Sequence, residues 1–190
     1  MDNLRERKKA LTRDSIESRA LDLFLERGYD RVRIDDICAD ALVSQRTFFR
    51  YYTSKEDLVL GRLRAHLMEA ERLFDTRPAG EPIGASLRTV ITRVAQDYVT
   101  EPDRELARLR LVTTTPALEA GLLNVFAGFE RLLRTFAAGR LDLSPDARRA
   151  RLLGAATVCA FRVGLELWIA EEGAPDLPAL VMTNVDELMP

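Results

Sequence analysis

The chain is poor in the side chains that carry most enzyme and metal chemistry. Its 190 residues include one histidine, two cysteines and one tryptophan. Cys38 and Cys159 stand far apart, each in an apolar helical pattern, which predicts two small core residues of a reduced protein rather than a disulfide or a metal site. The lone His66 has no serine or cysteine motif near it, and neither a phosphate-binding glycine loop nor a His-Glu-x-x-His pair occurs. We therefore expect no enzyme activity, no cofactor and no metal.

Long apolar runs are missing as well. The N-terminus is charged and carries no apolar signal segment, and no stretch has the length expected of a membrane span. No segment alternates convincingly between apolar and polar residues in the manner of a β-strand. The sequence therefore predicts an all-α protein of the cytoplasm.

Acidic and basic residues nearly balance, at 30 and 28, but they are unevenly distributed. Up to Lys55 there are 12 basic and 10 acidic residues, which leaves 16 basic and 20 acidic residues beyond it. A basic run from Arg5 to Lys9 precedes the first predicted helix. Two interpretations of this run stay open, an N-terminal arm that follows DNA phosphates and a disordered solubilising tail.

Two short helices joined by a two-residue turn are predicted near the N-terminus. The first covers Ile34 to Ala41 and has acidic residues in its first turn, near the positive end of the helix dipole. The second begins after Ser44, a good N-cap, and packs through Phe48 and Tyr52. A longer helix, from about Leu11 to Arg27, precedes the pair. This arrangement is a helix-turn-helix, whose second helix enters the major groove of DNA.

The exposed side of the second short helix carries amide, guanidinium, hydroxyl and aromatic groups and no carboxylate. Such groups bind base edges and phosphates, whereas carboxylates are repelled by the duplex. The alternative interpretation is an amphipathic helix with a solvated basic face. The candidate DNA-binding residues are Arg33, Ser44, Gln45, Arg46, Thr47, Phe49, Arg50, Tyr51 and Lys55.

The run from Gly28 to Leu58 resembles the N-terminal domain of the tetracycline-repressor family of bacterial regulators. The strongest matches are Phe24, Gly28-Tyr29, Asp36-Ile37, Val43-Ser44, Thr47-Phe48-Phe49 and Ser54-Lys55-Glu56. With the preceding helix, the resemblance covers roughly the first third of the chain. It implies a homodimeric, all-helical transcription factor, usually a repressor, that binds a palindromic operator and responds to a small-molecule effector. A minority of the family binds DNA only with its ligand present, and some members activate transcription.

The chain departs from the family pattern at positions that shape the turn and the DNA contacts. Leu42 stands where a small residue, commonly glycine, is usual, and a leucine at positive φ costs on the order of 1 kcal/mol. Either Leu42 accepts that strain or the turn relaxes. Arg33 cannot cap the following helix as a serine would, but its longer arm reaches a phosphate. Arg46 adds a bidentate contact to guanine, and Lys55 is expected to bind a phosphate.

From residue 55 onward a helical bundle is predicted, so residues 1–54 form the DNA-binding head and residues 55–190 the effector-binding and dimerisation body. The predicted helices are Lys55 to Asp75, Ile83 to Thr100, Asp103 to Thr113, Pro116 to Arg140, Pro145 to Glu172 and Leu177 to Leu188. The helix around residues 155–170 is apolar over more than one face, so a second surface must cover it. The resemblance implies a four-helix dimer interface there, in which small residues permit close approach: Gly154, Ala155, Ala156 and Gly164. The other interpretation is a central core helix.

The body is expected to bind a small molecule whose identity the sequence hides. Aromatic and apolar residues suit a hydrophobic effector, with Arg110 or Arg162 available for an anionic group. The candidate pocket residues are Leu106, Leu109, Arg110, Phe126, Phe129, Phe161, Arg162, Glu166 and Trp168. Each of them is also explained as an ordinary core or surface residue. The alternative function is a helical adaptor that binds only proteins, and it leaves the acid-free helix face unexplained.

Overall fold

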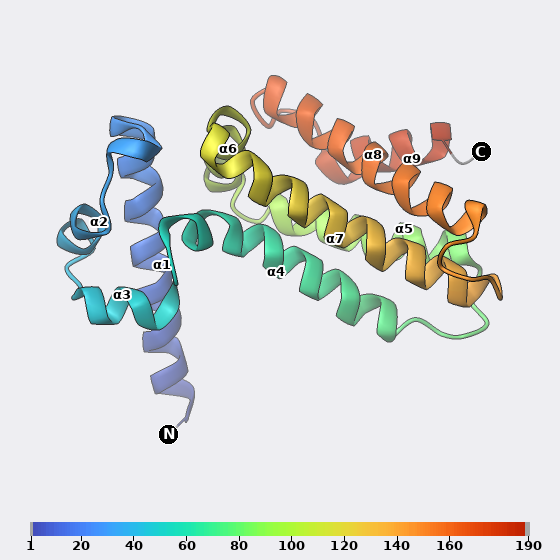
Figure 1. Cartoon of the computed structure of the whole chain (residues 1–190), viewed down its shortest axis with the longest axis horizontal. Helices are drawn as coiled ribbons and strands as arrows, with labels where there is room; N and C mark the ends of the chain where they lie inside the picture. Colours follow the sequence, from blue (N-terminus) through green and yellow to red (C-terminus); the bar gives the residue numbers. More distant parts are fainter. Residues whose placement is uncertain (1, 189–190) are drawn as a thin grey trace. The chain divides into compact units, whose positions relative to one another are not determined.

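The computed structural model describes residues 2–188, and in that range the chain is helical (Figure 1). The described residues form nine α-helices and one short 3-10 helix, with no strand among them. The elements are α1 (Asp2–Arg27), a 3-10 helix (Tyr29–Arg31), α2 (Ile34–Asp40), α3 (Gln45–Tyr51), α4 (Lys55–Asp75), α5 (Ile83–Tyr98), α6 (Pro102–Thr114), α7 (Pro116–Arg140), α8 (Arg148–Ala170) and α9 (Leu177–Leu188). The predicted all-α fold class is confirmed.

The first helix is longer than predicted. The basic run Arg5–Lys9 lies within α1, so the prediction of a disordered tail is wrong. Arginine, lysine and glutamate all favour helix. Lys9 also lies 3.9 Å from Glu6, one turn earlier in α1. An arm that follows phosphates would therefore be a helical extension.

The chain divides into two compact units that are not contiguous in sequence. Unit 1 comprises residues 1–62 and 107–119, and unit 2 comprises residues 63–106 and 120–190. The helices α4, α6 and α7 therefore each contribute residues to both units. The predicted division between residues 54 and 55 coincides with the start of α4 but not with a boundary of either unit. As a functional division it stays a prediction.

Unit 1 contains a buried ion pair. The Arg108 side chain of α6 is 0% exposed, and its guanidinium donates to the carboxylate of Glu17 in α1. It also donates to the main-chain carbonyl of Val59 in α4, at 3.0 Å. Glu17 in turn accepts from the hydroxyl of Tyr52, which ends α3, at 3.3 Å. Because a buried charge needs a counter-charge and hydrogen bonds, this pair joins α1, α4, α6 and the end of α3.

The predicted packing face of the second short helix is confirmed. Phe48 is 0% and Tyr52 is 2% exposed, and their ring centroids lie 5.7 Å apart. Burial, and then the negative charge of Glu17, raise the pKa of Tyr52 from 10.0 to about 12. Since the folded protein holds this proton more tightly than the unfolded chain, the stability that Tyr52 contributes is lost as the pH rises from 10 to 12.

The backbone of the turn between α2 and α3 is strained at Leu42. Leu42 has a φ of 53°, in the left-handed region, and its side chain is 91% exposed. The turn is closed by backbone hydrogen bonds from Leu42 to Ala39 (3.3 Å) and from Val43 to Cys38 (3.0 Å). An exposed side chain gains little from burial that would offset the strain. Of the two alternatives, an unrelaxed turn is therefore the one observed.

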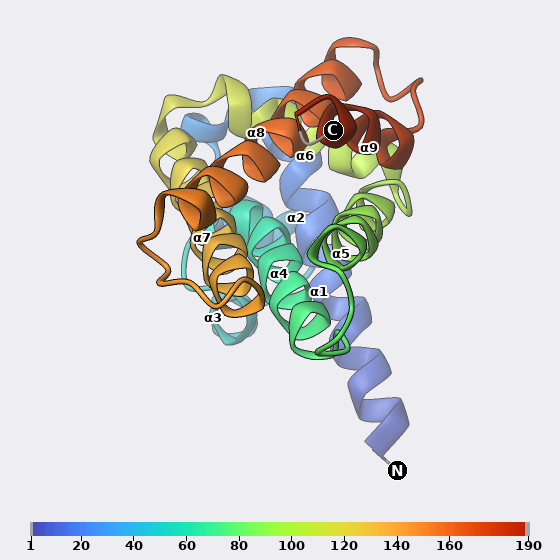
Figure 2. The ribbon, with the colours of Figure 1, turned by 90° about the vertical axis from the view of Figure 1, so that its right-hand side faces the viewer.

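Unit 2 is a helical bundle in which α8 packs on α9 and α9 packs on α5 (Figure 2). A Cβ atom at Gly154 would lie 2.9 Å from the carbonyl oxygen of Glu130 in α7. One at Gly164 would lie 2.6 Å from a methyl group of Val181 in α9. These two glycines therefore permit close packing within the chain and not, as predicted, between two copies. For Ala155 and Ala156, which are exposed and half-buried respectively, close approach between two copies stays a prediction.

One face of α8 is buried and another is exposed. Trp168 is 0% exposed, whereas Leu152 is 57% exposed and Cys159 is exposed as well. Cys159 is therefore not the core residue that was predicted, whereas Cys38 is. By length and composition α8 could also cross a membrane, so the expectation that no segment is long enough is wrong. This is weak support for a span, because core helices of soluble proteins meet the same criterion.

Replacing Arg108 with methionine should lower the free energy of unfolding by about 3–5 kcal/mol, because Glu17 would lose its counter-charge in a largely buried site. Urea denaturation measures this loss. The matched control is Arg93→Met, which opens an exposed pair with Asp97 (3.9 Å) and should cost less than about 1 kcal/mol. Equal losses in the two variants would contradict a special contribution of the buried pair.

Replacing Leu42 with glycine should raise the free energy of unfolding by about 0.5–1 kcal/mol. Glycine adopts positive φ without the clash of a Cβ atom, and this gain exceeds the added freedom of the unfolded chain. The control is Met68→Gly, at an exposed site within α4, which should lose about 1 kcal/mol. Urea denaturation compares all three proteins, and a Leu42→Gly variant less stable than the parent would argue against strain in the turn.

Candidate nucleic-acid interface

The helix α3 begins as predicted after Ser44. The Ser44 hydroxyl oxygen accepts a hydrogen bond from the main-chain N–H of Thr47 at 3.1 Å. The hydroxyl oxygens of Ser44 and Thr47 also lie 3.0 Å apart. This N-cap satisfies a main-chain donor of the first turn, which would otherwise need water. In a helix-turn-helix, the first turn of the second helix is the part that meets base edges, so the cap fixes the residues that are predicted to contact bases.

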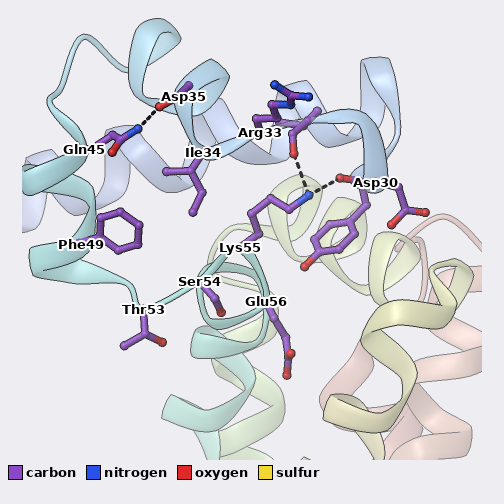
Figure 3. Close-up of a pocket in the computed structure, with 12 residues that line it drawn as sticks. Asp30, Arg33, Ile34, Asp35, Gln45, Phe49, Thr53, Ser54, Lys55 and Glu56 are labelled. Carbon is purple, nitrogen blue, oxygen red and sulfur yellow. Dashed lines mark hydrogen bonds between the residues drawn. The ribbon is translucent and has the colours of Figure 1, made fainter.

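Two of the candidate DNA-binding arginines are free to bind a ligand. Arg33 and Arg46 are exposed, and within residues 4–188 neither guanidinium makes a hydrogen bond or an ion pair. The main-chain N–H of Arg33 donates to Asp36 at 2.7 Å, so α2 is capped from within. Figure 3 shows the Arg33 guanidinium directed away from Lys55. Each guanidinium therefore keeps five N–H donors for phosphate or guanine.

Lys55 has a structural role that the sequence did not indicate. Its ammonium donates to the carbonyl oxygens of Tyr29 (2.8 Å) and Val32 (2.7 Å) and lies 4.4 Å from the Tyr29 ring centroid (Figure 3). Burial lowers the pKa of Lys55 below its ordinary value. An ammonium has three donors, so one N–H remains for a phosphate. Phosphate binding by Lys55 stays a prediction.

An open groove of about 680 Å³ lies between α2, α3 and the start of α4, with all of its lining residues in unit 1. Gln45 and Phe49 line it from α3, and Asp35 lines it from α2 (Figure 3). The side-chain amide of Gln45 donates to the Asp35 carboxylate. From the sequence, the acidic residues at this end of α2 were expected only to interact favourably with the helix dipole. The contact between Gln45 and Asp35 could not be predicted, because no regular sequence spacing relates residues of two helices that are joined by a turn.

The rest of α3 presents cationic and aromatic groups. Arg50 donates to the Tyr51 hydroxyl at 3.3 Å, and its guanidinium carbon lies 4.9 Å from the Tyr51 ring centroid. Phe49 is 52% exposed and meets Phe48 edge to face, at a centroid distance of 5.5 Å. With Arg46 and no carboxylate in α3, the helix face has the composition that binds the edges and backbone of a duplex.

The nine predicted pocket residues are divided between the two compact units. Leu109 and Arg110 belong to unit 1, and the other seven belong to unit 2. Arg162 and Glu166 lie 3.6 Å apart on the exposed side of α8, so they do not line the interior of unit 2. Two of the set do lie together, since a Cβ atom at Gly173 would meet Leu106 at 2.7 Å and Trp168 at 3.6 Å. The effector site as a whole stays a prediction.

Polar side chains of α4, α5 and α8 lie in the interior of unit 2. His66 of α4 is 2% exposed, and its ring centroid lies 4.3 Å from that of Tyr98 in α5. Tyr98 lies 5.9 Å from Phe161 of α8. The indole N–H of the buried Trp168 has no acceptor among the described residues. Polar groups in an otherwise apolar interior are typical of a ligand site, although in sequence His66 was only a lone helical histidine.

Two family models match the chain. Residues 16–61 match bacterial regulatory proteins of the tetR family, and residues 81–190 match the MftR C-terminal domain. The HTH-type transcriptional regulator TcmR of Streptomyces glaucescens is 38% identical over 153 residues, which cover 76% of this chain and 68% of TcmR. MftR of Mycobacterium tuberculosis, named as a transcriptional regulator of mycofactocin biosynthesis, is 28% identical over 179 residues, which cover 92% of this chain and 88% of MftR.

Solved structures share the fold. NalD, the secondary repressor of the MexAB-OprM efflux pump in Pseudomonas aeruginosa, has a TM-score of 0.64 at 20% identity, over 96% of this chain and 95% of NalD. FadR of Thermus thermophilus, in complex with lauroyl-CoA, has a TM-score of 0.59 at 24% identity, over 93% of each chain. A family match over more than half of the chain and a relative at 38% identity lead to one conclusion. The chain belongs to the tetR family of bacterial regulatory proteins and is a DNA-binding transcriptional regulator.

Proposed function

We propose that two copies of the chain bind a palindromic operator as a repressor in the cytoplasm, and that a small amphipathic effector bound in unit 2 releases them. The acid-free face of α3, with the free guanidinium of Arg46 in its first turn, is the observation that carries the DNA-binding part. Amide, guanidinium and aromatic groups on such a turn suit the major groove. An adaptor that binds only proteins offers no reason for this face.

The exposed side of α8 supports a homodimer. Leu152 is 57% exposed, and the exposed Ala155 and Cys159 lie one and two turns further along the same stripe. Soluble proteins rarely leave an apolar stripe of this kind uncovered, and a second copy would cover it with the same stripe in a twofold arrangement. A twofold dimer offers two copies of α3 to two half-sites of a palindrome.

The interior of unit 2 supports an effector that has both apolar and polar parts. Phe161 and Trp168 supply apolar surface, and His66 supplies a polar ring. The indole N–H of Trp168 would gain a partner from a ligand carbonyl. The FadR proteins of Thermus thermophilus and Bacillus subtilis were solved with lauroyl-CoA and stearoyl-CoA, so acyl thioesters are suitable first probes. We expect α4, which contributes residues to both units, to carry the effect of the ligand to the head.

An unbiased selection from random duplexes should recover a palindrome, and sedimentation should show a dimer at micromolar concentration. Binding should weaken steeply with salt, because neutralised phosphates release counterions. Arg46→Ala should lose about 1–3 kcal/mol at one base pair of each half-site and relax the preference there. Arg72→Ala, in the exposed part of α4, is the control and should keep the sequence preference. A monomer, or a selection without any preferred sequence, would contradict the proposal.

Saturating operator DNA should weaken the binding of lauroyl-CoA by the factor by which lauroyl-CoA weakens operator binding, about 5–150-fold, because coupling between two sites is reciprocal. Calorimetric titrations with and without operator measure both factors. Equal affinity in the two titrations would show that the ligand is no inducer, and tighter binding with operator would show a ligand that promotes DNA binding. If neither lauroyl-CoA nor stearoyl-CoA binds, acyl thioesters are not the effector class.

A further inference from the structure

We propose that Asp35 determines which base Gln45 reads, by holding the Gln45 side-chain amide in one of its two orientations. The inference rests on the proposed insertion of α3 into the major groove. Asp35 is the second residue of α2, Gln45 is the first residue of α3, and both are exposed on the groove of Figure 3. The amide nitrogen of Gln45 donates to the Asp35 carboxylate.

The carboxylate dictates how the amide is turned. An ionised carboxylate accepts hydrogen bonds and donates none, so only the amide nitrogen of Gln45 is stable against Asp35. A flipped amide would bring its oxygen against the carboxylate, and two acceptors would then face each other. No other described side chain makes a hydrogen bond to the Gln45 amide. Asp35 alone therefore selects the orientation.

The groups of Gln45 that remain form an ordered pair. Asp35 takes one amide hydrogen, which leaves the oxygen as an acceptor and the second N–H as a donor beside it. In the major groove adenine offers the matching pair, a donor at N6 and an acceptor at N7. Guanine offers two acceptors, and thymine offers one acceptor and a methyl group. The oriented amide of Gln45 therefore fits adenine at one position of each half-site.

The charge of Asp35 allows a positioning role of this residue to be distinguished from a purely structural role. A negative charge near the duplex is repelled by the phosphates, whatever the sequence. Removal of this charge should tighten binding to every duplex, whereas loss of the amide orientation should loosen discrimination among bases. If Asp35 served only to tie α2 to α3, its removal would disturb α3 and weaken binding to every duplex. A positioning role and a structural role therefore predict changes of opposite sign in non-specific binding.

The test uses the whole 190-residue chain and a duplex set with every base pair at each half-site position. The variants are Asp35→Asn, Gln45→Ala and the double variant. Asparagine matches the shape of aspartate but accepts either orientation of the Gln45 amide. We expect Asp35→Asn to lower the preference for adenine at one position about ten-fold and to bind non-specific duplex at low salt at least as tightly as the parent. Gln45→Ala should lose the preference at the same position, and Asp35→Asn should change nothing further in that background.

Asp40→Asn is the matched control, because Asp40 is an exposed residue of α2 that pairs with Arg19 at 3.8 Å and not with α3. It removes the same charge and should leave the base preference unchanged. A change of preference that persists without Gln45 would mean that Asp35 contacts a base itself, and a uniform loss of binding would mean a structural tie. Either result in the variant overturns the proposal about Asp35, whereas sequence-selective binding by the parent still supports the proposed function. A parent without sequence preference would instead overturn the proposed function, and this proposal with it.

Discussion

Arg108 and Glu17 lie 91 residues apart in the chain and meet where Arg108 is closed to water. Either charge without its partner would strongly destabilise the fold, so each side chain requires the other at this place. Arg108 also binds the backbone of α4 at Val59, and Glu17 also binds the Tyr52 hydroxyl at the end of α3. Through Tyr52, the residue that follows α3, the pair that joins α1, α4 and α6 is therefore also connected to the end of α3.

The surface around α3 divides into side chains that the protein already uses and side chains that it leaves free. Lys55 and Gln45 each have donors committed to the protein, to two carbonyl oxygens and to the Asp35 carboxylate respectively. Arg33 and Arg46 have guanidinium groups with no partner among the described residues. Committed groups are preorganised and lose little freedom on binding, whereas free arginines must be ordered by the duplex. The same small surface would therefore combine preorganised groups with groups that become ordered only on binding.

The sequence predicted best what local chemistry decides. The bounds of α4, α7 and α9 were predicted correctly from prolines, glycines and capping residues, as was the cap at Ser44. Contacts between distant segments were not predictable, because one sequence holds no record of which helices meet. For this reason Gly154 was assigned to the wrong interface, Cys159 to a core it does not enter, and the partnerships of Arg108 and Asp35 went unseen. The effector site stays a prediction, and its nine candidate residues are divided between the two units.

Unit 1 is built from two separate stretches of the chain, and this has a consequence for protein engineering. A chimera that joins the first 54 residues of another regulator to this body would keep Arg108 but lose Glu17 as its partner. The graft would then bury an arginine with no acid to meet it, unless the donor supplies an acid at the equivalent place in its first helix. A transplant of new DNA specificity should therefore carry residues 107–119 together with the N-terminal segment, because the two stretches form one compact unit.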